Sequence, residues 1–594
     1  MPFAPGVRAN PKRFARPLAG FACYLGLAAL TPLLVSCGGA AVSSATTYPI
    51  DSNTTYYIGN SGCSDGNAGT SSSAPWCTFN NVNGRTFSPG DQILLASGSG
   101  WLQQMSPLGS GVSGNPITIG CYGSTCSSNY PVINAGSSNP GIYLVNPSWW
   151  TVTNLTLTGS SAGISSYFTQ LGNQGLVFEN LYIYNLNGPS IAFDGYNSNP
   201  PTSIPSSQYI ISGVTFQNIG IANAGTINLT AGYAGAQQVN NGYPNAQQNI
   251  LMKNVYASNY KGCFGFANAE DVTVIDSFWQ QGDADGSCGT ATYMVALNNV
   301  TFNNGIYSDD AWTNNYDNGA FVYDNQETEI RWRGDYFYQN AASGIEGAEN
   351  LCFNTCSSST NSQFEVSSSA FYGNSTQDEC SYYGDISVAY SPETQMTVQN
   401  NVYSDTSQSC NAFVNQANPT YQTFINNTNI APNGLYNSAF QYSGTQGANQ
   451  WTYEYWNGSA WWVVTPTYNS STGYWNFSTG AWIDQFDIQP DICTDCWTAR
   501  MWQAPSTGTV TVAGWVLKNT TGTEVQAGIS HNGTWVWGNG SGSWYTLGAN
   551  DQVGVATNAT VSVAAGDYLV FAVGNQSGGT AANAVVSWMP SISY

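Results

Sequence analysis

Asp and Glu are the residues of this chain that are best suited to catalysis. The 594 residues include 33 Asp and Glu but one His, which is His531 in a His-Asn-Gly turn near the C-terminus. A Ser-His-Asp or Cys-His nucleophile therefore has no base in the first 530 residues. Two carboxyl groups can instead hydrolyse a glycosidic bond, when one is protonated and the other ionised.

A short phrase that contains an acid occurs twice, at an interval of 25 residues. Gly319-Ala-Phe-Val-Tyr-Asp324-Asn returns as Gly344-Ile-Glu346-Gly-Ala-Glu349-Asn. If this interval is one coil of a solenoid, Asp324 and Glu349 lie on neighbouring coils about 4.8 Å apart. That spacing suits the roughly 5–5.5 Å between the carboxyl groups of retaining glycosidases. Glu346 has the opposite strand parity and is the alternative to Glu349.

Further polar residues surround the doubled phrase. Asp309, Asp310 and Trp312 could add a third carboxylate and a stacking ring. Arg331, and Arg333 after it, could lower the pKa of a neighbouring carboxylate. We predict that Asp309, Asp310, Trp312 and Arg331 bind substrate.

Short strand-like runs that could position these residues recur from about residue 150 to residue 427. They alternate apolar and polar residues, and many carry an Asn or Ser before an apolar residue, as in Val152–Leu157, Val177–Tyr184, Val214–Ile219, Ile250–Val255, Val272–Phe278 and Val295–Phe302. The Asn/Ser position recurs after 23 and then 22 residues at Asn254, Ser277 and Asn299. Such a period indicates a solenoid, in which Asn at the bends adopts left-handed angles and forms hydrogen-bonded ladders.

Two stretches resemble known families. Tyr56-Tyr-Ile, Asp65-Gly, Gly69-Thr and Pro89-Gly-Asp-Gln-Ile-Leu resemble the start of right-handed parallel β-helix proteins of the pectate-lyase-like superfamily. The doubled phrase resembles consecutive coils of β-helix glycosidases, including β-xylosidase-like families. That resemblance implies that Asp324 is the nucleophile and Glu349 the acid/base, with no cofactor.

The composition changes after residue 430 to a Trp- and Tyr-rich alternation with Gly-rich turns. The predicted fold is all-β: a right-handed parallel β-helix over 51–430, followed by a C-terminal β-sandwich over 434–594. The sandwich resembles jelly-roll accessory domains of polysaccharide-degrading enzymes. Its aromatic residues either stack on sugar rings or fill the sandwich core.

The N-terminus has the pattern of an export signal over residues 1–36. A basic segment precedes the apolar run Leu18–Val35, and Leu34-Val-Ser-Cys37-Gly resembles a bacterial lipobox. This implies lipidation of Cys37, a flexible tether over 37–50, and a place in the bacterial cell envelope facing the periplasm or the exterior. An ordinary signal peptide and a single membrane anchor are the alternatives.

Twelve cysteines follow Cys37, and an even number in an exported protein indicates disulfides. Nearest-neighbour pairing predicts Cys63–Cys77, Cys121–Cys126, Cys263–Cys288, Cys352–Cys356, Cys380–Cys410 and Cys493–Cys496. Zinc is the alternative for Cys493 and Cys496, although no second ligand pair completes a site.

The formal charge of −22 argues against nucleic acid and polyanionic partners, because binding them requires clustered Lys and Arg. Three functions remain. The first is an exported, monomeric glycoside hydrolase that acts on a neutral polysaccharide or oligosaccharide. The second is a polysaccharide lyase with Lys261 or Arg331 as base and Ca²⁺ held by Asp283, Asp285 or Asp309. The third is a glycan-binding surface lipoprotein without catalysis.

Asp283-Ala-Asp285-Gly also resembles the start of a calcium loop. The twelfth position is Met294 where a Glu would be required, so a plain turn is the alternative.

Overall fold

Strands account for nearly all regular structure in the chain. The computed structural model describes residues 53–195, 209–231, 246–282, 292–308, 319–323, 327–347, 361–375, 384–388, 393–404, 413–430, 434–460, 465–493, 495–538, 543–575 and 580–594. Over these ranges the helical elements are short 3-10 helices, η1 (Phe79–Asn81), η3 (Ala448–Gln450) and η4 (Ala581–Asn583). None of the helices in these ranges has the length and apolar character needed to cross a membrane.

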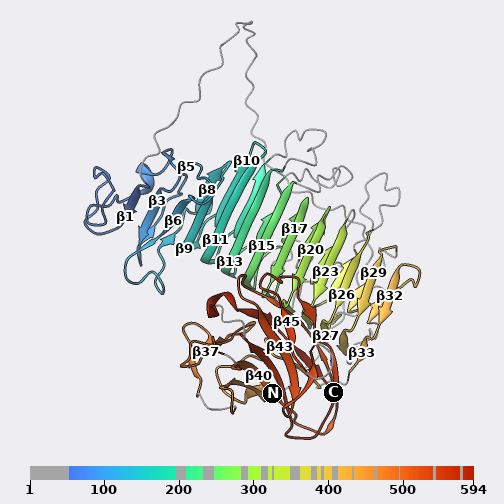
Figure 1. The fold of residues 1–594 in the computed structure, drawn as a ribbon. Helices are drawn as coiled ribbons and strands as arrows, with labels where there is room; N and C mark the ends of the chain where they lie inside the picture. Colours follow the sequence, from blue (N-terminus) through green and yellow to red (C-terminus); the bar gives the residue numbers. More distant parts are fainter. Residues whose placement is uncertain are drawn as a thin grey trace, which may run out of the picture. The chain divides into compact units, whose positions relative to one another are not determined.

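Parallel strands stack coil upon coil from the N-terminal region to residue 429, and Figure 1 shows them in sequence order from β1 to β33. Each strand pairs with its counterpart in the coils before and after it, as Leu176 does with Trp150 and Val214. Coil-to-coil pairing of this kind makes a parallel β-helix, which confirms the predicted fold class.

The strands form three faces. The first face contains β1 (Thr55–Ile58), β3 (Gln92–Ala96), β6 (Ile117–Tyr122), β9 (Trp150–Thr158), β11 (Asn173–Tyr184), β13 (Ile211–Ala222), β15 (Gln247–Ser258), β17 (Ala269–Ile275), β20 (Asn298–Asn303), β23 (Thr328–Arg333), β26 (Phe364–Ser367), β29 (Met396–Gln399) and β32 (Gln422–Ile425). The second face contains the C-terminal parts of β9, β11, β13 and β15, with β4 (Gly100–Trp101), β7 (Val132–Ile133), β18 (Phe278–Gln280), β21 (Ile306–Ser308), β24 (Tyr336–Tyr338), β27 (Ala370–Tyr372), β30 (Val402–Ser404) and β33 (Thr428–Asn429).

The third face is a separate parallel sheet. Its strands are β8 (Ile142–Val145), β10 (Ile164–Phe168), β12 (Ile191–Gly195), β14 (Ile227–Leu229), β16 (Phe264–Ala267), β19 (Thr292–Val295), β22 (Phe321–Tyr323), β25 (Ile345–Gly347), β28 (Ile386–Ser387) and β31 (Val414–Asn415). A small pair of strands, β2 (Thr86–Phe87) and β5 (Leu108–Gly109), lies beside the first coils. Alternate residues of all three faces point inward, and Ile, Val, Leu and Phe fill the core.

A ladder of left-handed residues forms the bend between the first and second faces. Its members in successive coils all have positive φ: Asn154, Asn180, Asn218, Asn254, Asp276, Asn304, Gly334, Ser368, Asn400 and Asn426. Asn tolerates this conformation better than other residues with a side chain. The Nδ2 of Asn254 donates to Oδ1 of Asn218 at 2.8 Å, and Asn218 donates to Asn180 at 3.0 Å. The predicted Asn ladder is therefore present.

The predicted equivalence of Asn254, Ser277 and Asn299 is wrong. Lys253 pairs with Ile275, 22 residues later, but Ile275 pairs with Asn303, 28 residues later. Asn254 belongs to the bend described above, whereas Asn299 donates to Asp271 on the first face. Loops of different length separate the strands, so a constant interval does not identify equivalent positions.

Antiparallel strands after residue 434 build a β-sandwich. One sheet contains β35 (Trp451–Trp456), β40 (Trp497–Gln503), β48 (Tyr568–Gly574), β43 (Val525–His531), β44 (Thr534–Trp537) and β45 (Tyr545–Leu547). The other two sheets contain β34 (Leu435–Asn437), β50 (Ser591–Ser593), β41 (Gly508–Ala513) and β47 (Ala559–Val563), and β36 (Thr467–Asn469), β37 (Tyr474–Asn476), β38 (Trp482–Ile483), β39 (Asp487–Gln489), β49 (Val586–Trp588), β42 (Trp515–Lys518) and β46 (Val555–Ala556). The core between the sheets contains Trp451, Trp475, Trp502 and Trp588. Of the two roles predicted for the aromatic residues, these four rings therefore fill the core.

The sandwich packs on the bend ladder of the β-helix. Asn304 Nδ2 donates to Ser587 Oγ at 2.6 Å, and Asn558 Nδ2 donates to Ser368 Oγ at 3.0 Å. At Gly334 a Cβ would lie 2.7 Å from the Cβ of Trp515, so glycine permits the closest approach. The bend and the adjoining part of the second face are therefore occupied by protein.

Three predicted disulfides are present, Cys63–Cys77, Cys121–Cys126 and Cys493–Cys496. The last one leaves neither thiol available to zinc. Cys263 is also in a disulfide. Its predicted partner and the other predicted pairs lie outside the described residues, at Cys288, Cys352, Cys356, Cys380 and Cys410.

Candidate functional site

Two of the predicted site residues, Glu346 and Arg331, lie in the part of the chain that the structure describes. The others, Asp324, Glu349, Asp309, Asp310, Trp312 and the lipidation site Cys37, lie outside the described residues. The geometry of the site is therefore built from Glu346, Arg331 and their surroundings.

Glu346 lies at the centre of β25 on the third face. It pairs with Val322 of β22 and with Ser387 of β28. Its neighbour Ile345 is in the core, so strand alternation directs Glu346 to the outer side of the sheet. The side chain is nevertheless only 1% exposed, and its row neighbours Val322 and Ser387 are also buried. Val322, Glu346 and Ser387 thus form a row of buried residues on the outer side of the third face.

Gly319, the first glycine of the doubled phrase, makes room for this carboxyl group. A Cβ at residue 319 would lie 3.2 Å from the Cβ of Glu346 and 3.3 Å from its Oε2. Both distances are closer than ordinary van der Waals contact, so a larger residue at 319 would displace Glu346. The absence of a side chain at Gly319 therefore leaves space for the side chain of Glu346 in the next coil.

The interval of 25 residues taken from the doubled phrase is one residue too long. Phe321 pairs with Ile345 and Val322 with Glu346, so each residue meets the one 24 positions later. The register aligns Gly344 with Ala320, since the Phe321 N–H donates to the carbonyl of Gly344. Glu346, rather than a residue one place away, is therefore the acid opposite Val322.

A second buried acid, Glu327, was not singled out in the sequence. It lies between β22 and β23, is fully buried, and its N–H donates to Oδ1 of Asn361 in the next coil at 3.2 Å. Glu329, two residues later, is partly exposed, and nothing in the local sequence distinguishes it from the buried Glu327. A usable signal would have been its place at the turn that begins the strand Thr328–Arg333, three residues after Asp324.

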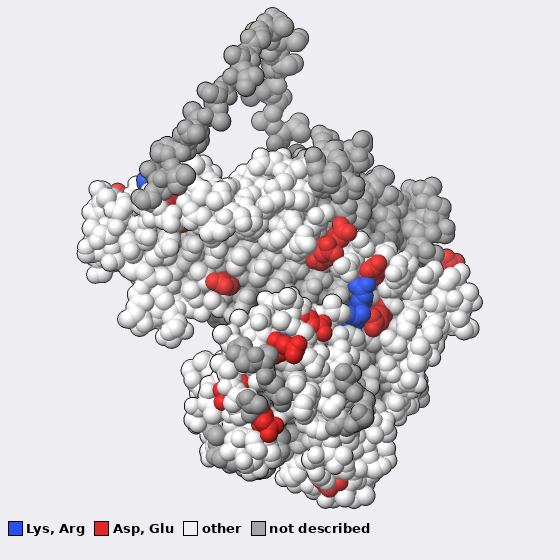
Figure 2. All heavy atoms as spheres, in the orientation of Figure 1, with Lys and Arg blue, Asp and Glu red and all other residues white. Residues whose placement is uncertain are grey.

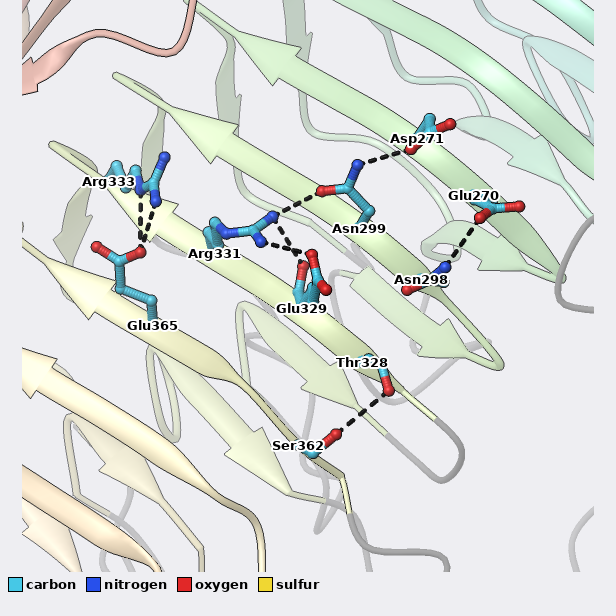
Figure 3. Close-up of polar contacts among 10 residues, drawn as sticks. All are labelled: Glu270, Asp271, Asn298, Asn299, Thr328, Glu329, Arg331, Arg333, Ser362 and Glu365. Carbon is cyan, nitrogen blue, oxygen red and sulfur yellow. Dashed lines mark hydrogen bonds and ion pairs between the residues drawn. The ribbon is translucent and has the colours of Figure 1, made fainter.

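Arg331 lies on the outer side of the first face, not on the third face with Glu346. Figure 3 shows its guanidinium between Glu329 and Asn299. It donates to Glu329 Oε2 and to Asn299 Oδ1, each at 2.7 Å, and Asn299 donates onward to Asp271 at 2.6 Å. The side chain is 22% exposed, so one edge of this row remains open to solvent.

Arg333, two residues further along the same strand, contacts the sandwich. It donates to Glu365 at 2.6 Å, and its guanidinium lies 4.8 Å from the centre of the Trp515 ring. Burial would raise the pKa of Glu365, but the hydrogen bonds and charge of Arg333 outweigh burial and lower it. The prediction that these arginines lower the pKa of a neighbouring carboxylate is confirmed for Glu365.

Glu270 lies on the same face, two coils before Arg331, and pairs with Asn298 of the coil between them. Burial and the charge of Asp271 raise its pKa, although Asn298 donates to it at 2.9 Å. Figure 2 shows that acidic and basic side chains meet in one patch of this view, while most of the surface seen there is uncharged.

The groups required by a lyase are less well arranged. Arg331 forms an ion pair with Glu329 at 2.7 Å, and Lys261 Nζ donates to the carbonyl of Leu186 at 3.2 Å. The proposed calcium ligands Asp283, Asp285 and Asp309 lie outside the described ranges. Within those ranges, no three His, Cys, Asp or Glu side chains are grouped to hold a metal ion.

Comparison with known proteins gives limited matches. No protein-family model matches the chain. A 167-residue stretch, 24% of the chain, is 29% identical to the lacto-N-biosidase of Bifidobacterium longum subsp. longum, and this chain spans about a tenth of that relative's length, 10%.

Solved structures also resemble the chain. The GH136 lacto-N-biosidase of Eubacterium ramulus aligns over 63% of this chain and 67% of its own, with a TM-score of 0.48 and 15% identity. The alginate lyase of Paenibacillus sp. str. FPU-7 aligns over 56% of this chain and 99% of its own, with a TM-score of 0.35 and 14% identity.

Proposed function

We propose that the protein is a glycoside hydrolase that cleaves an uncharged oligosaccharide or polysaccharide with a pair of carboxyl groups on neighbouring coils. The observation that carries the proposal is the buried carboxyl group of Glu346 on the outer side of β25, beside the strand that precedes Asp324. The stretch that is 29% identical to a lacto-N-biosidase supports the same reaction class.

In the proposed reaction Asp324 is the nucleophile. Its carboxylate attacks the anomeric carbon while a protonated glutamic acid donates its proton to the departing glycosidic oxygen. Water then hydrolyses the glycosyl-enzyme, with the same Glu acting as base.

Glu346 and Glu349 are the two candidates for the acid/base. The pairing of Glu346 with Val322 and the space left by Gly319 support Glu346. The family resemblance supports Glu349. Asp309, Asp310 and Trp312 are proposed to contact the sugar, whereas Arg331 lies on the first face and is withdrawn from the sugar-binding residues.

Hydrolysis of two chromogenic substrates tests the proposal and separates the candidates. The full chain is assayed on neutral aryl glycosides, including a nitrophenyl lacto-N-bioside, and Asp324→Ala is expected to lose at least about a thousandfold in kcat. The true acid/base variant, Glu346→Ala or Glu349→Ala, is expected to lose activity on a substrate with a poor leaving group. It should keep its kcat/KM, which reports the first step, on a dinitrophenyl glycoside whose leaving group needs no proton, while kcat falls because hydrolysis of the glycosyl-enzyme has lost its base.

Glu393→Gln, an exposed acid of the same β-helix, is the control and is expected to be fully active. Activity that survives Asp324→Ala and the double variant Glu346→Ala/Glu349→Ala overturns the proposal. Release of an unsaturated product that a chelator abolishes would establish the lyase, and binding without turnover of any glycan would establish the non-catalytic alternative.

We also propose that the protein is exported and held at the cell envelope by a lipid on Cys37. The lipobox-like sequence around Cys37 supports this. Fractionation tests it: Cys37→Ser is expected to move the protein from the membrane to the soluble fraction, and an unchanged membrane fraction would contradict the lipid anchor.

A further inference from the structure

Two exposed aromatic rings lie in one row on the outer side of the second face. Tyr182 pairs with Gly220, Gly220 with Tyr256, and Tyr256 with Phe278. Among the described residues, the aromatic rings that count as exposed are Tyr182 at 46%, Tyr256 at 40% and Phe424 at 44%. Two of these three therefore share a single row on a regular sheet.

Neighbouring side chains hold the two rings in place. At Gly220 a Cβ would lie 3.2 Å from the ring of Tyr182, so this ring leans across the glycine of the next coil. Tyr256 is fixed edge-on to Phe278, with ring centres 5.3 Å apart, and its hydroxyl accepts a hydrogen bond from Gln280 at 2.8 Å. Both rings are thus held against the sheet by neighbouring side chains.

The surroundings of the rings are polar but carry no charge. The adjacent row of the same face reads Tyr184, Ala222, Ser258 and Gln280 in successive coils. Hydroxyl and amide groups therefore alternate with aromatic rings, and no described residue of these two rows between Tyr182 and Gln280 is acidic or basic. An uncharged ligand with hydroxyl groups and apolar ring faces matches this surface.

The sandwich ends the row at one side. Beyond Phe278 the row continues with Ile306 and Tyr336, which pack against Phe440 of the sandwich. The exposed part of the row therefore extends from the sandwich toward the earlier coils. Tyr182 and Tyr256 are two coils apart, about 10 Å at 4.8 Å per coil, which is the length of a disaccharide unit.

We propose that the row of Tyr182, Gly220 and Tyr256 binds a neutral glycan chain that runs along the axis of the β-helix, with the two rings stacked on alternate sugars. A second copy of the protein fits less well, because a stable interface needs roughly 800 Å² from each partner and two half-exposed rings supply far less. The site lies on a different face from Glu346, and its binding does not require hydrolysis.

Native affinity electrophoresis of the full chain in gels that contain soluble glucan, mannan, xylan or galactan tests the proposal. Retardation by at least one of these polysaccharides is expected. Tyr182→Ala/Tyr256→Ala is expected to weaken that binding about ten- to a hundredfold, because each stacked ring contributes a modest free energy. Tyr182→Trp/Tyr256→Trp should keep it, which separates loss of stacking from a folding defect.

Tyr143→Ala, a partly exposed outward tyrosine of the third face, is the matched control and is expected to bind like the wild type. Hydrolysis of the small chromogenic glycoside should be the same in all these variants. Equal retardation of the double alanine variant and the wild type overturns the proposal. A wild type that sediments as a dimer, and becomes monomeric only in the double alanine variant, overturns it in favour of self-association.

Discussion

Replacement of Asp276 by Asn is predicted to stabilise the protein at neutral pH and to change little near pH 4. Asp276 lies in the bend ladder and is 2% exposed where the sandwich covers it. Its Oδ2 accepts a hydrogen bond from Asn519 at 2.9 Å, and Ser587 Oγ donates to its Oδ1. Asn519 also donates to both carboxyl oxygens of Asp487, each at 2.6 Å. Two carboxyl groups thus share one buried amide.

Burial, and secondly the charge of Asp487, raise the pKa of Asp276 well above its ordinary value of 3.8. Asp484 adds repulsion, and burial with the charge of Asp487 raises its own pKa to about 7. Burial raises the pKa of Asp487 as well, and the charges of Lys253 and Arg500 offset only part of that rise. Asp276 therefore stays protonated in the folded protein where the unfolded chain has lost the proton.

The sign of the pH effect follows from this difference. Below the ordinary Asp pKa both states are protonated, and the folded state carries no penalty. As the pH rises further, each unit removes about 1.4 kcal/mol of stability until the raised pKa is reached. Asn cannot ionise and its amide imitates the protonated carboxyl group. The difference in stability between Asp276→Asn and the wild type should therefore grow by about 1.4 kcal/mol per pH unit above pH 4.

Urea unfolding followed by tryptophan fluorescence at pH 4, 5, 6 and 7 measures this difference. Asp495→Asn, which changes an exposed acid of the sandwich, is the control and should give a curve parallel to the wild type. If Asp276→Asn is less stable than the wild type by the same amount at every pH, the charged form of Asp276 stabilises the folded state, and the reasoning is refuted.

Three further changes test the packing. Gly334→Ala should destabilise the docked sandwich by about 1–3 kcal/mol more than Gly373→Ala in urea unfolding, since both residues have positive φ but the new Cβ at 334 would lie 2.7 Å from the Cβ of Trp515 in the sandwich and 2.5 Å from Oδ1 of Asn304, whereas the one at 373 would lie 3.5 Å from its nearest atom, in Gln339; equal effects would contradict the contact. Arg500→Met should cost about 3–5 kcal/mol, because the buried guanidinium donates to four oxygens inside the sandwich; a loss below about 1 kcal/mol would show that the site repacks. Cys63→Ser/Cys77→Ser should lower the unfolding free energy by about 3 kcal/mol, because the disulfide joins positions 14 residues apart; unchanged unfolding would mean that this loop adds nothing to stability.

Local features of the sequence predicted the fold class correctly. Alternating strand patterns and repeated Asn residues depend on each residue's own backbone preferences, so they can be recognised without a structure. The ladder from Asn154 to Asn254 follows this rule, since Asn accepts positive φ in every coil. The neighbouring cysteines 63 and 77, 121 and 126, and 493 and 496 were also paired correctly because close partners in sequence meet at little entropic cost.

The coil register was predicted less well. Loops of unequal length join the strands, and the pairing of β22 with β25 at 24 residues is chosen by the packing of inward residues on both strands. The glycines at 319 and 344 are 25 residues apart, whereas the strands that follow them pair at 24, so the two glycines do not occupy equivalent positions. A shift of one residue reverses which side of the sheet a side chain faces.

The sequence by itself thus determined that this chain forms a β-helix followed by a sandwich, and it predicted carboxyl groups as the candidate catalytic residues. Only the tertiary structure decided that Glu346 and Glu327 are buried, that Arg331 lies on another face, and that the sandwich covers Asp276. Strand periodicity acts over a few residues, whereas burial depends on segments hundreds of residues apart, such as Asp276 and Ser587. A pattern within one strand cannot show which distant surface will exclude water from it.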